Sequence, residues 1–227
     1  MKDIIFTLVA SLALSISLFI ETSSWWIRVG ATKENLGHYI SRSNIYLYGG
    51  RFFALIFGVL LAFQIERGVA PAFISLTLSV SFALAFCLQF LLLNSFVRRP
   101  IISFLSMCLS LHSSTNQSEG DFVVPRLDRP LFLGTLAASL SFSLGLSVPP
   151  LLAAVFIANR LVISNIGQLI NAFGMIVILF FVDQKLYRAF DTGNLYADLI
   201  TYSKARSLAF LLISGTFLII FLSMSVA

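Results

Sequence analysis

Residues 71–97 read PAFISLTLSVSFALAFCLQFLLLNSFV, a run of 27 residues without one charged side chain. A helix that crosses the hydrocarbon core of a bilayer needs about 20 mostly apolar residues, so this run is long enough to span a membrane. Pro71 suits the first turn of a helix, because its missing N–H would have no intrahelical partner there. The run therefore predicts a transmembrane helix that begins at Pro71.

Five further runs of the same character lie on either side of it. Together they predict six spans, over residues 4–27, 40–65, 71–97, 131–157, 161–182 and 205–224. Open sheets cannot cross lipid and a barrel would show short alternating segments, so we expect an all-α bundle that forms one membrane domain over residues 1–227. Pro149 and Pro150 fall near the end of the fourth span, where they predict a kink or a break.

The composition excludes most classes of soluble protein. Hydrophobic residues make up 58% of the 227 residues and charged residues 11%, whereas soluble domains average about 45–50% and about 25%. A soluble enzyme, a disordered chain and a nucleic-acid-binding protein are disfavoured, although the net charge is +5. Cys87 and Cys108 have no metal-site spacing and are expected to be buried. No P-loop or HExxH motif occurs, so we expect a transporter without cofactor or metal rather than an enzyme.

The segment between the third and fourth spans has a different pattern. Ile101, Phe104, Leu105, Cys108 and Leu111 recur at helical spacing, and serines line the opposite side, over a stretch too short to span a membrane. This pattern predicts a short interfacial helix. The polar stretch that follows it, residues 112–121, predicts a loop.

Basic residues are distributed unevenly over the two sides of the predicted bundle. Eleven of the fifteen fall in or beside connections one, three and five: Arg28, Lys33, Arg42, Arg98, Arg99, Arg126, Arg129, Lys185, Arg188, Lys204 and Arg206. The other side has three: Lys2, Arg67 and Arg160. The positive-inside rule then predicts that these connections are cytoplasmic and that both termini lie outside. Trp25, Trp26 and Tyr39 predict an aromatic belt at the interface.

Arg51 lies near the middle of the second span, where an arginine is costly unless it faces the bundle interior or a wet cavity. It shares one helix face with other polar and small residues, namely Ser41, Asn44, Tyr48, Gly58 and Ala62. This face indicates either a cationic cavity wall or a structural arginine paired with a carboxylate. Glu21 in the first span is the expected partner, and it could equally be a proton-coupling acid.

The fifth span carries a second polar face, formed by Ser164, Gly167, Gln168, Asn171 and Gly174. Such residues either pack helices together or line a path. Because the second span has a cationic face, we expect the polar residues of the fifth span to line the same cavity as that face. Asp183 and Arg206 are expected at the same level near the cytoplasmic rim, where a salt bridge between them is one interpretation.

Small residues also recur at every fourth position of the fourth span, at Thr135, Ser139, Ser143 and Ser147. Small side chains at this spacing let helices approach closely, so this face predicts helix packing. Six spans make a narrow bundle for a bulky substrate. A homodimer that uses this face as its interface would enlarge the cavity. The sequence is compatible with both a homodimer and a monomer.

Two sets of short motifs resemble the alternate lipid II flippases, the Amj family. In the first half they are Glu21-Thr22, Arg28–Thr32 and Asn44–Arg51, and in the second half Leu169–Met175, Leu179–Asp183, Asp191, Gly193, Arg206 and Gly215-Thr216. The sequence departs from the family pattern at Phe52-Phe53, which replaces an Ala-Asn step, and at Glu21, which lacks a nearby His. The resemblance implies export of the undecaprenyl-pyrophosphate-linked peptidoglycan precursor across the bacterial inner membrane. It marks as candidate functional positions Arg28, Asn44, Arg51, Asn171, Asp183 and Arg206.

The sequence is compatible with three functions. The first is a flippase for lipid II or a related polyprenyl-linked glycan, in which Arg51, with Arg28 or Arg206, holds the pyrophosphate. The amides of Asn44, Gln168 and Asn171 would bind the headgroup, and Glu21 would neutralise Arg51 in the empty state. The second is an exporter of small cations or drugs that uses the Glu21 carboxylate, and the third is a membrane assembly subunit that transports nothing.

Overall fold

The computed structural model describes residues 2–32, 34–111, 127–192 and 194–226, and every regular element in these ranges is helical. Six helical stretches are long and apolar enough to cross a membrane, which confirms the expected all-α polytopic membrane protein. Lys33, Arg126, Gly193 and the predicted loop over residues 112–121 lie outside the described residues.

Five of the six spans are single helices and one is composite. The single helices are α1 (Lys2–Arg28), α2 (Leu36–Glu66), α3 (Pro71–Leu93), α5 (Arg129–Val155) and α8 (Leu195–Val226). The composite span joins α6 (Arg160–Val177), the π-helix η2 (Ile178–Asp183) and α7 (Gln184–Asp191). Two short elements complete the fold, α4 (Ser95–Cys108) and the 3-10 turn η1 (Ile157–Asn159).

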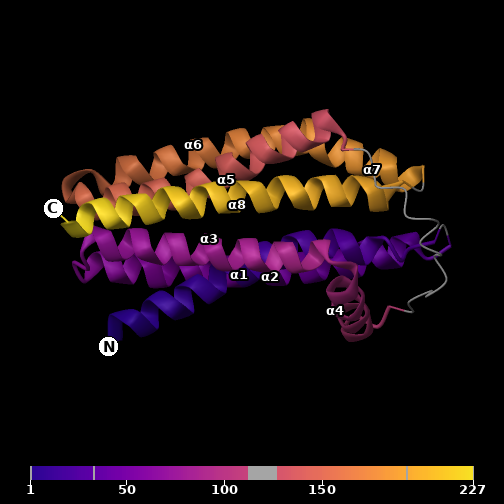
Figure 1. Cartoon of the computed structure of the whole chain (residues 1–227), viewed down its shortest axis with the longest axis horizontal. Coiled ribbons are helices and arrows are strands. Elements are labelled where there is room, and N and C mark those ends of the chain that lie inside the picture. The colour runs from indigo at the N-terminus through magenta and orange to yellow at the C-terminus, as the bar shows by residue number, and fades with distance from the viewer. Residues whose placement is uncertain (1, 33, 112–126, 193, 227) are drawn as a thin grey trace.

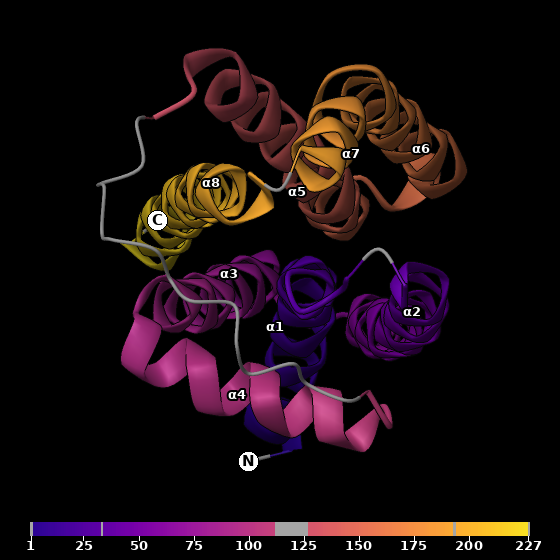
Figure 2. The same cartoon turned by 90° about the vertical axis from the view of Figure 1, so that its right-hand side faces the viewer.

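The spans form two layers, with α1, α2 and α3 in one and α5, α6 and α8 in the other (Figure 2). The layers meet mainly where α3 packs along α8, whereas α2 makes a smaller contact with α5 of the second layer. α1 begins and α8 ends at the same end of the bundle, called here the terminal end (Figure 1). The opposite end, where α1 ends and α4 lies, is called the loop end.

Serine side chains help to join the two layers along the α3–α8 contact. The Ser79 hydroxyl donates to the Ser214 carbonyl at 3.0 Å, and the Ser214 hydroxyl donates to the Ser79 carbonyl at the same distance. Further along the contact, the Ser75 hydroxyl donates to the Phe217 carbonyl at 2.7 Å. Small hydroxyl residues therefore bring these backbones close together, as they commonly do between membrane helices. Phe82 and Phe210 fill the adjoining core, with ring centroids 6.0 Å apart.

Two helix boundaries differ from the predicted spans, and each difference changes the position of an arginine within the fold. α3 ends at Leu93, because Asn94 leaves the helical conformation and its side chain accepts the Phe96 N–H, so Arg98 belongs to α4. α8 begins at Leu195 rather than at residue 205. The predicted span started too late because Asp198 and Lys204 lower the hydropathy of the first turns of the helix. Arg206 consequently lies well inside α8 rather than at its start.

The predicted break at Pro149 and Pro150 is wrong, because α5 continues through both prolines to Val155. Pro149 has no N–H to give the Gly145 carbonyl, which lies four residues earlier. α6 packs tightly against this site: a Cβ on Gly167 would lie 2.5 Å from the Pro149 Cγ and 3.0 Å from the Gly145 oxygen. The glycine at position 167 therefore permits the close approach of α5 and α6.

Several expectations about surface and interior need correction. The small-residue face of α5 is buried inside the bundle, as predicted for packing, so it cannot serve as a homodimer interface. Cys87 and Cys108 are exposed rather than buried. The short helix expected after the third span is present as α4, but Phe104 and Cys108 of its predicted apolar face are exposed while Ser106 is buried.

Candidate functional site

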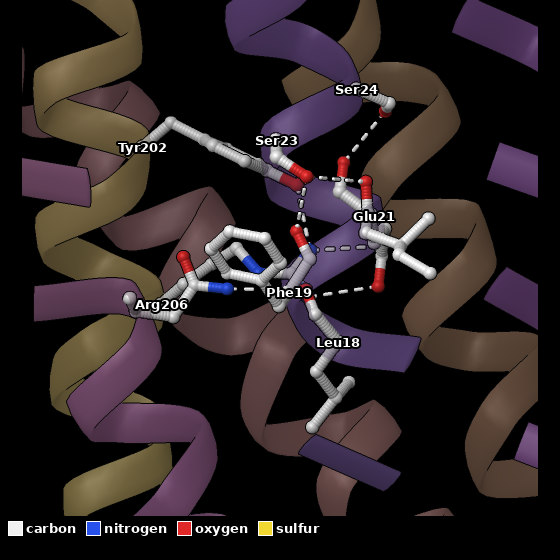
Figure 3. A network of polar contacts seen from close by, with 9 residues as sticks. Leu18, Phe19, Glu21, Ser23, Ser24, Tyr202 and Arg206 are labelled. Atoms are coloured by element: carbon white, nitrogen blue, oxygen red, sulfur yellow. Dashed lines mark hydrogen bonds and ion pairs between the residues drawn. The ribbon is translucent and has the colours of Figure 1, made fainter. Parts of the chain in front are cut away.

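The central feature of the site is an ion pair between α1 and α8. The Arg206 Nη1 and Nη2 atoms lie 2.8 Å from the two carboxylate oxygens of Glu21, which makes the pair bidentate. In Figure 3 the two side chains point toward one another from their helices. Because the two parallel contacts fix both distance and orientation, the pair sets how α1 and α8 lie relative to one another.

The two partners differ in how far they are shielded. The Arg206 side chain is 5% exposed, whereas the Glu21 side chain keeps 36% of its surface accessible. Arg206 Nη1 also donates to the Tyr202 hydroxyl at 2.7 Å, one helical turn earlier on α8. Its buried Nε has no hydrogen-bond partner in the part of the chain that the structure describes. Arg206 is therefore held by Tyr202 of its own helix and by Glu21 of α1.

Arg51 is not the direct partner of Glu21, contrary to the sequence-based expectation. It lies midway along α2 and is exposed, and its guanidinium carbon is 4.9 Å from the centre of the Tyr48 ring. It still interacts electrostatically with Glu21, because the neighbouring Gly50 packs against Ile20 of α1. Among the described residues no carboxylate pairs directly with Arg51, so its charge remains available to a ligand.

Arg28 is anchored at the loop end by residues of the neighbouring helix. Its Nε donates to the Ser43 hydroxyl at 2.9 Å and its Nη2 to the Asn44 Oδ1 at 2.8 Å. Its guanidinium carbon also lies 4.2 Å from the centre of the Trp25 ring. The residue is 3% exposed, and among the described residues its Nη1 has no hydrogen-bond partner. Arg28 is thus fixed in place with one buried donor unused.

Asp183 is placed by the irregular part of the composite span. It is the last residue of the π-helix η2, a rare helix type that is often found at functional sites. The half-buried carboxylate interacts electrostatically with Arg28 and Glu21, without a direct ion pair to either arginine of α1 or α8 among the described residues. The expected rim salt bridge between Asp183 and Arg206 is therefore not formed.

These side chains form one charged cluster in the loop-end half of the bundle, defined as Glu21, Arg28, Asn44, Arg51, Asp183, Tyr202 and Arg206. Three arginines stand against two carboxylates, which leaves one positive charge in excess. Guanidinium groups with free N–H donors match the oxygens of a phosphate or carboxylate. The arrangement can therefore bind an anion, and in described residues no group of three or more His, Cys, Asp or Glu side chains could hold a metal ion.

The expected contribution of the fifth span to the site is not found. Asn171 packs against α5 instead, and its Oδ1 occupies the space that a Cβ on Gly145 would need. Gln168 is exposed on α6, and within the described part of the chain no hydrogen bond links it to the charged cluster. The face that holds Gly167, Asn171 and Gly174 is thus a packing face toward α5.

The predicted aromatic belt is also wrong, because Trp25, Trp26 and Tyr39 are all buried. The tryptophans pack against arginines: the Arg98 guanidinium carbon lies 4.3 Å from the centre of the Trp26 ring. Arg98 also donates to the Tyr196 hydroxyl at 2.7 Å, which ties α4 to α8. Their role is to hold buried guanidinium groups near the loop end, which cation–π contact favours.

Sequence reasoning missed Tyr202 and Ser43. Tyr202 lies four residues before Arg206, a spacing that places two side chains on the same helix face. The pair would have been found if the sixth span had been extended back to Leu195. Ser43 gave no such indication, because its contact with Arg28 depends on how α1 and α2 pack.

Comparison of the chain with protein-family models, with curated proteins and with solved structures finds no match. The function is therefore inferred from the chemistry of the charged cluster and from the family resemblance of the motifs.

Replacing Arg28 with lysine tests whether this side chain is anchored as described. A lysine ammonium cannot make both hydrogen bonds and stack on Trp25, so Arg28→Lys should lower the unfolding free energy by about 1–3 kcal/mol. Denaturant titration of the purified protein in detergent measures it. Arg42→Lys, at an exposed site of α2, is the control and should leave stability unchanged. Equal effects of the two changes would contradict the anchoring.

Proposed function

We propose that the protein is a flippase that moves lipid II, or a related polyprenyl-linked glycan, across the bacterial inner membrane. The observation that carries the proposal is the mid-span position of Arg51, which is exposed and has no carboxylate bound directly to it among the described residues. A charge in such a place is costly unless it serves a ligand or a wet path. A pyrophosphate attached to a long hydrocarbon chain supplies the matching anion.

The low burial of two spans is compatible with a substrate whose hydrocarbon tail stays in the bilayer. In the most apolar window of α2, and in that of residues 165–191, only 17% of the residues are buried, against 28–44% in the other spans. α2 and α6 lie along the same edge of the bundle in Figure 2. A headgroup held at the charged cluster would enter from this edge, while its polyprenyl chain remains in the bilayer.

The distribution of basic residues favours entry of the substrate from the loop end. The side chains of Arg98, Arg99, Arg129, Lys185 and Arg188 belong to elements at the loop end. By the positive-inside rule this end is cytoplasmic, and both termini are then outside. Basic residues near a membrane surface attract anionic headgroups, so the loop end would concentrate the substrate beside the charged cluster.

The exporter of small cations is less well supported. Such a site needs a carboxylate that is free to bind the cation or to exchange a proton, but both oxygens of Glu21 contact Arg206 at 2.8 Å. Arg51 and Arg28 add positive charge nearby, which would repel a cation.

The function can be tested in bacteria from which the resident lipid II flippase is depleted. The wild-type chain should restore growth, and Arg51→Ala should lose most of the rescue at equal expression, because the headgroup loses its mid-membrane cation. Arg67→Ala is a matched control, since Arg67 is also an exposed arginine of the α2 region over an aromatic ring, here Phe63 at 5.4 Å. Full rescue by Arg51→Ala would contradict the role of Arg51, and no rescue by well-expressed wild type would contradict the function.

Cysteine labelling separates a transporter from an assembly subunit. In a chain with Cys87→Ser and Cys108→Ser, we expect a membrane-impermeant maleimide to label Arg51→Cys, because a flippase would hold Arg51 in a wet path. Phe52→Cys, at the same depth but pointing elsewhere and 63% exposed, should stay unlabelled in lipid. An unlabelled Arg51→Cys would indicate a dry interface and favour the assembly subunit.

A further inference from the structure

A second feature of the molecule, a groove between α2 and α5, lies on the terminal-end side of the charged cluster. It encloses about 220 Å³ and its lining is apolar except for one residue, Arg160. α2 contributes mostly small or aliphatic side chains, among them Ala54, Gly58 and Ala62, and α5 contributes Leu146, Pro149, Pro150 and Ala153. Its shape and lining suit a hydrocarbon chain rather than a polar solute.

The groove continues the face of α2 that carries the charged cluster. Asn44, Arg51 and Gly58 follow one another at steps of seven residues, so they lie within about 40° of one another around the helix axis. Gly58 leaves the groove open, because a Cβ at this position would meet nothing within 4 Å. The groove therefore lies on the same face of α2 as Arg51, on its terminal-end side.

Arg160 stands at the terminal-end rim of the groove. It is half-buried, and its Nε donates to the Ala153 carbonyl at 3.3 Å, which holds the stem of the side chain against α5. Among the described residues no carboxylate pairs with Arg160. Its two terminal amino groups are thus free to bind phosphate oxygens, which guanidinium groups match in geometry.

We infer that the groove and Arg160 form an exit site for the same single-chain anionic lipid, with its phosphate on Arg160 and its chain in the groove. The groove runs from Arg160 at the terminal end toward Ala54. A lipid in the outer leaflet has the same direction, with its headgroup at the surface and its chain toward the bilayer centre. The volume accommodates part of one hydrocarbon chain, and a polyprenyl phosphate carries a single chain on its anionic headgroup. This inference rests on the proposed function for the identity of the lipid.

The test is native mass spectrometry of the full chain in detergent, with undecaprenyl phosphate as the probe and dioleoyl phosphatidylglycerol as the comparison lipid. The wild type should bind undecaprenyl phosphate in preference to the phospholipid. Gly58→Leu should fill the groove and weaken this binding at least about tenfold, and Arg160→Ala should weaken it by a similar factor through the lost charge-assisted hydrogen bonds.

Two controls separate these effects from damage to the fold. Gly49→Leu adds the same side chain to the same helix, and nine residues place it about 180° from Gly58, also in open space. Arg67→Ala removes another arginine from the terminal-end side of the bundle. Both should bind like wild type, and all four variants should keep the wild-type thermal stability.

Unchanged binding to Gly58→Leu, or equal binding of the two-chain phospholipid, would overturn the inference. The outcomes also distinguish it from the proposed function. If the wild type rescues the depleted cells and Gly58→Leu binds the probe normally, the exit site is wrong while the flippase stands. If the probe binds in the groove but the wild type never rescues, the site stands and the flippase function fails.

Discussion

A buried arginine in a membrane-spanning bundle needs a counter-charge, and in this protein the constraint is met by the bidentate pair of Arg206 and Glu21. The pair joins α8 of one layer to α1 of the other, and each of its N···O distances is 2.8 Å. Removing one partner of a buried pair is far more damaging than replacing both, because it leaves an uncompensated charge. The contact between α1 and α8 at this level, and with it the positions of Glu21 and Arg206 in the charged cluster, depends on this pair.

The same pairing determines which charges remain free. Because Glu21 is engaged by Arg206, it compensates Arg51 only through space, and Asp183 acts on Arg28 in the same indirect way. Arg28 is immobilised by Ser43 and Asn44 but keeps one buried donor unused. The outcome is two anchored guanidinium groups, those of Arg28 and Arg206, beside the exposed Arg51, whose face of α2 continues to an apolar groove. Cation and groove together suit a molecule that is anionic at one end and apolar along its length.

Sequence reasoning reached the spans and one face of the site, since both depend on short-range pattern. Hydropathy predicted the six crossings, and helical spacing placed Asn44, Arg51 and Gly58 on one face of α2. It failed where the answer depends on contacts between helices. The choice of Arg206 over Arg51 as the partner of Glu21 follows from how α8 packs on α1. The place of Asp183 follows from a π-helix, and the orientation of Asn171 follows from the close approach at Gly145. None of these features produces a periodic pattern in the sequence.

The pairing on which this account depends is most directly tested by a double-mutant cycle of Glu21→Gln, Arg206→Gln and the double variant, with unfolding free energies measured in detergent. We predict that the two single changes are each strongly destabilising and that the double variant is more stable than their sum implies, with a coupling energy of about 2–3 kcal/mol. Additivity to within about 0.5 kcal/mol would contradict it, because the two side chains would then not interact.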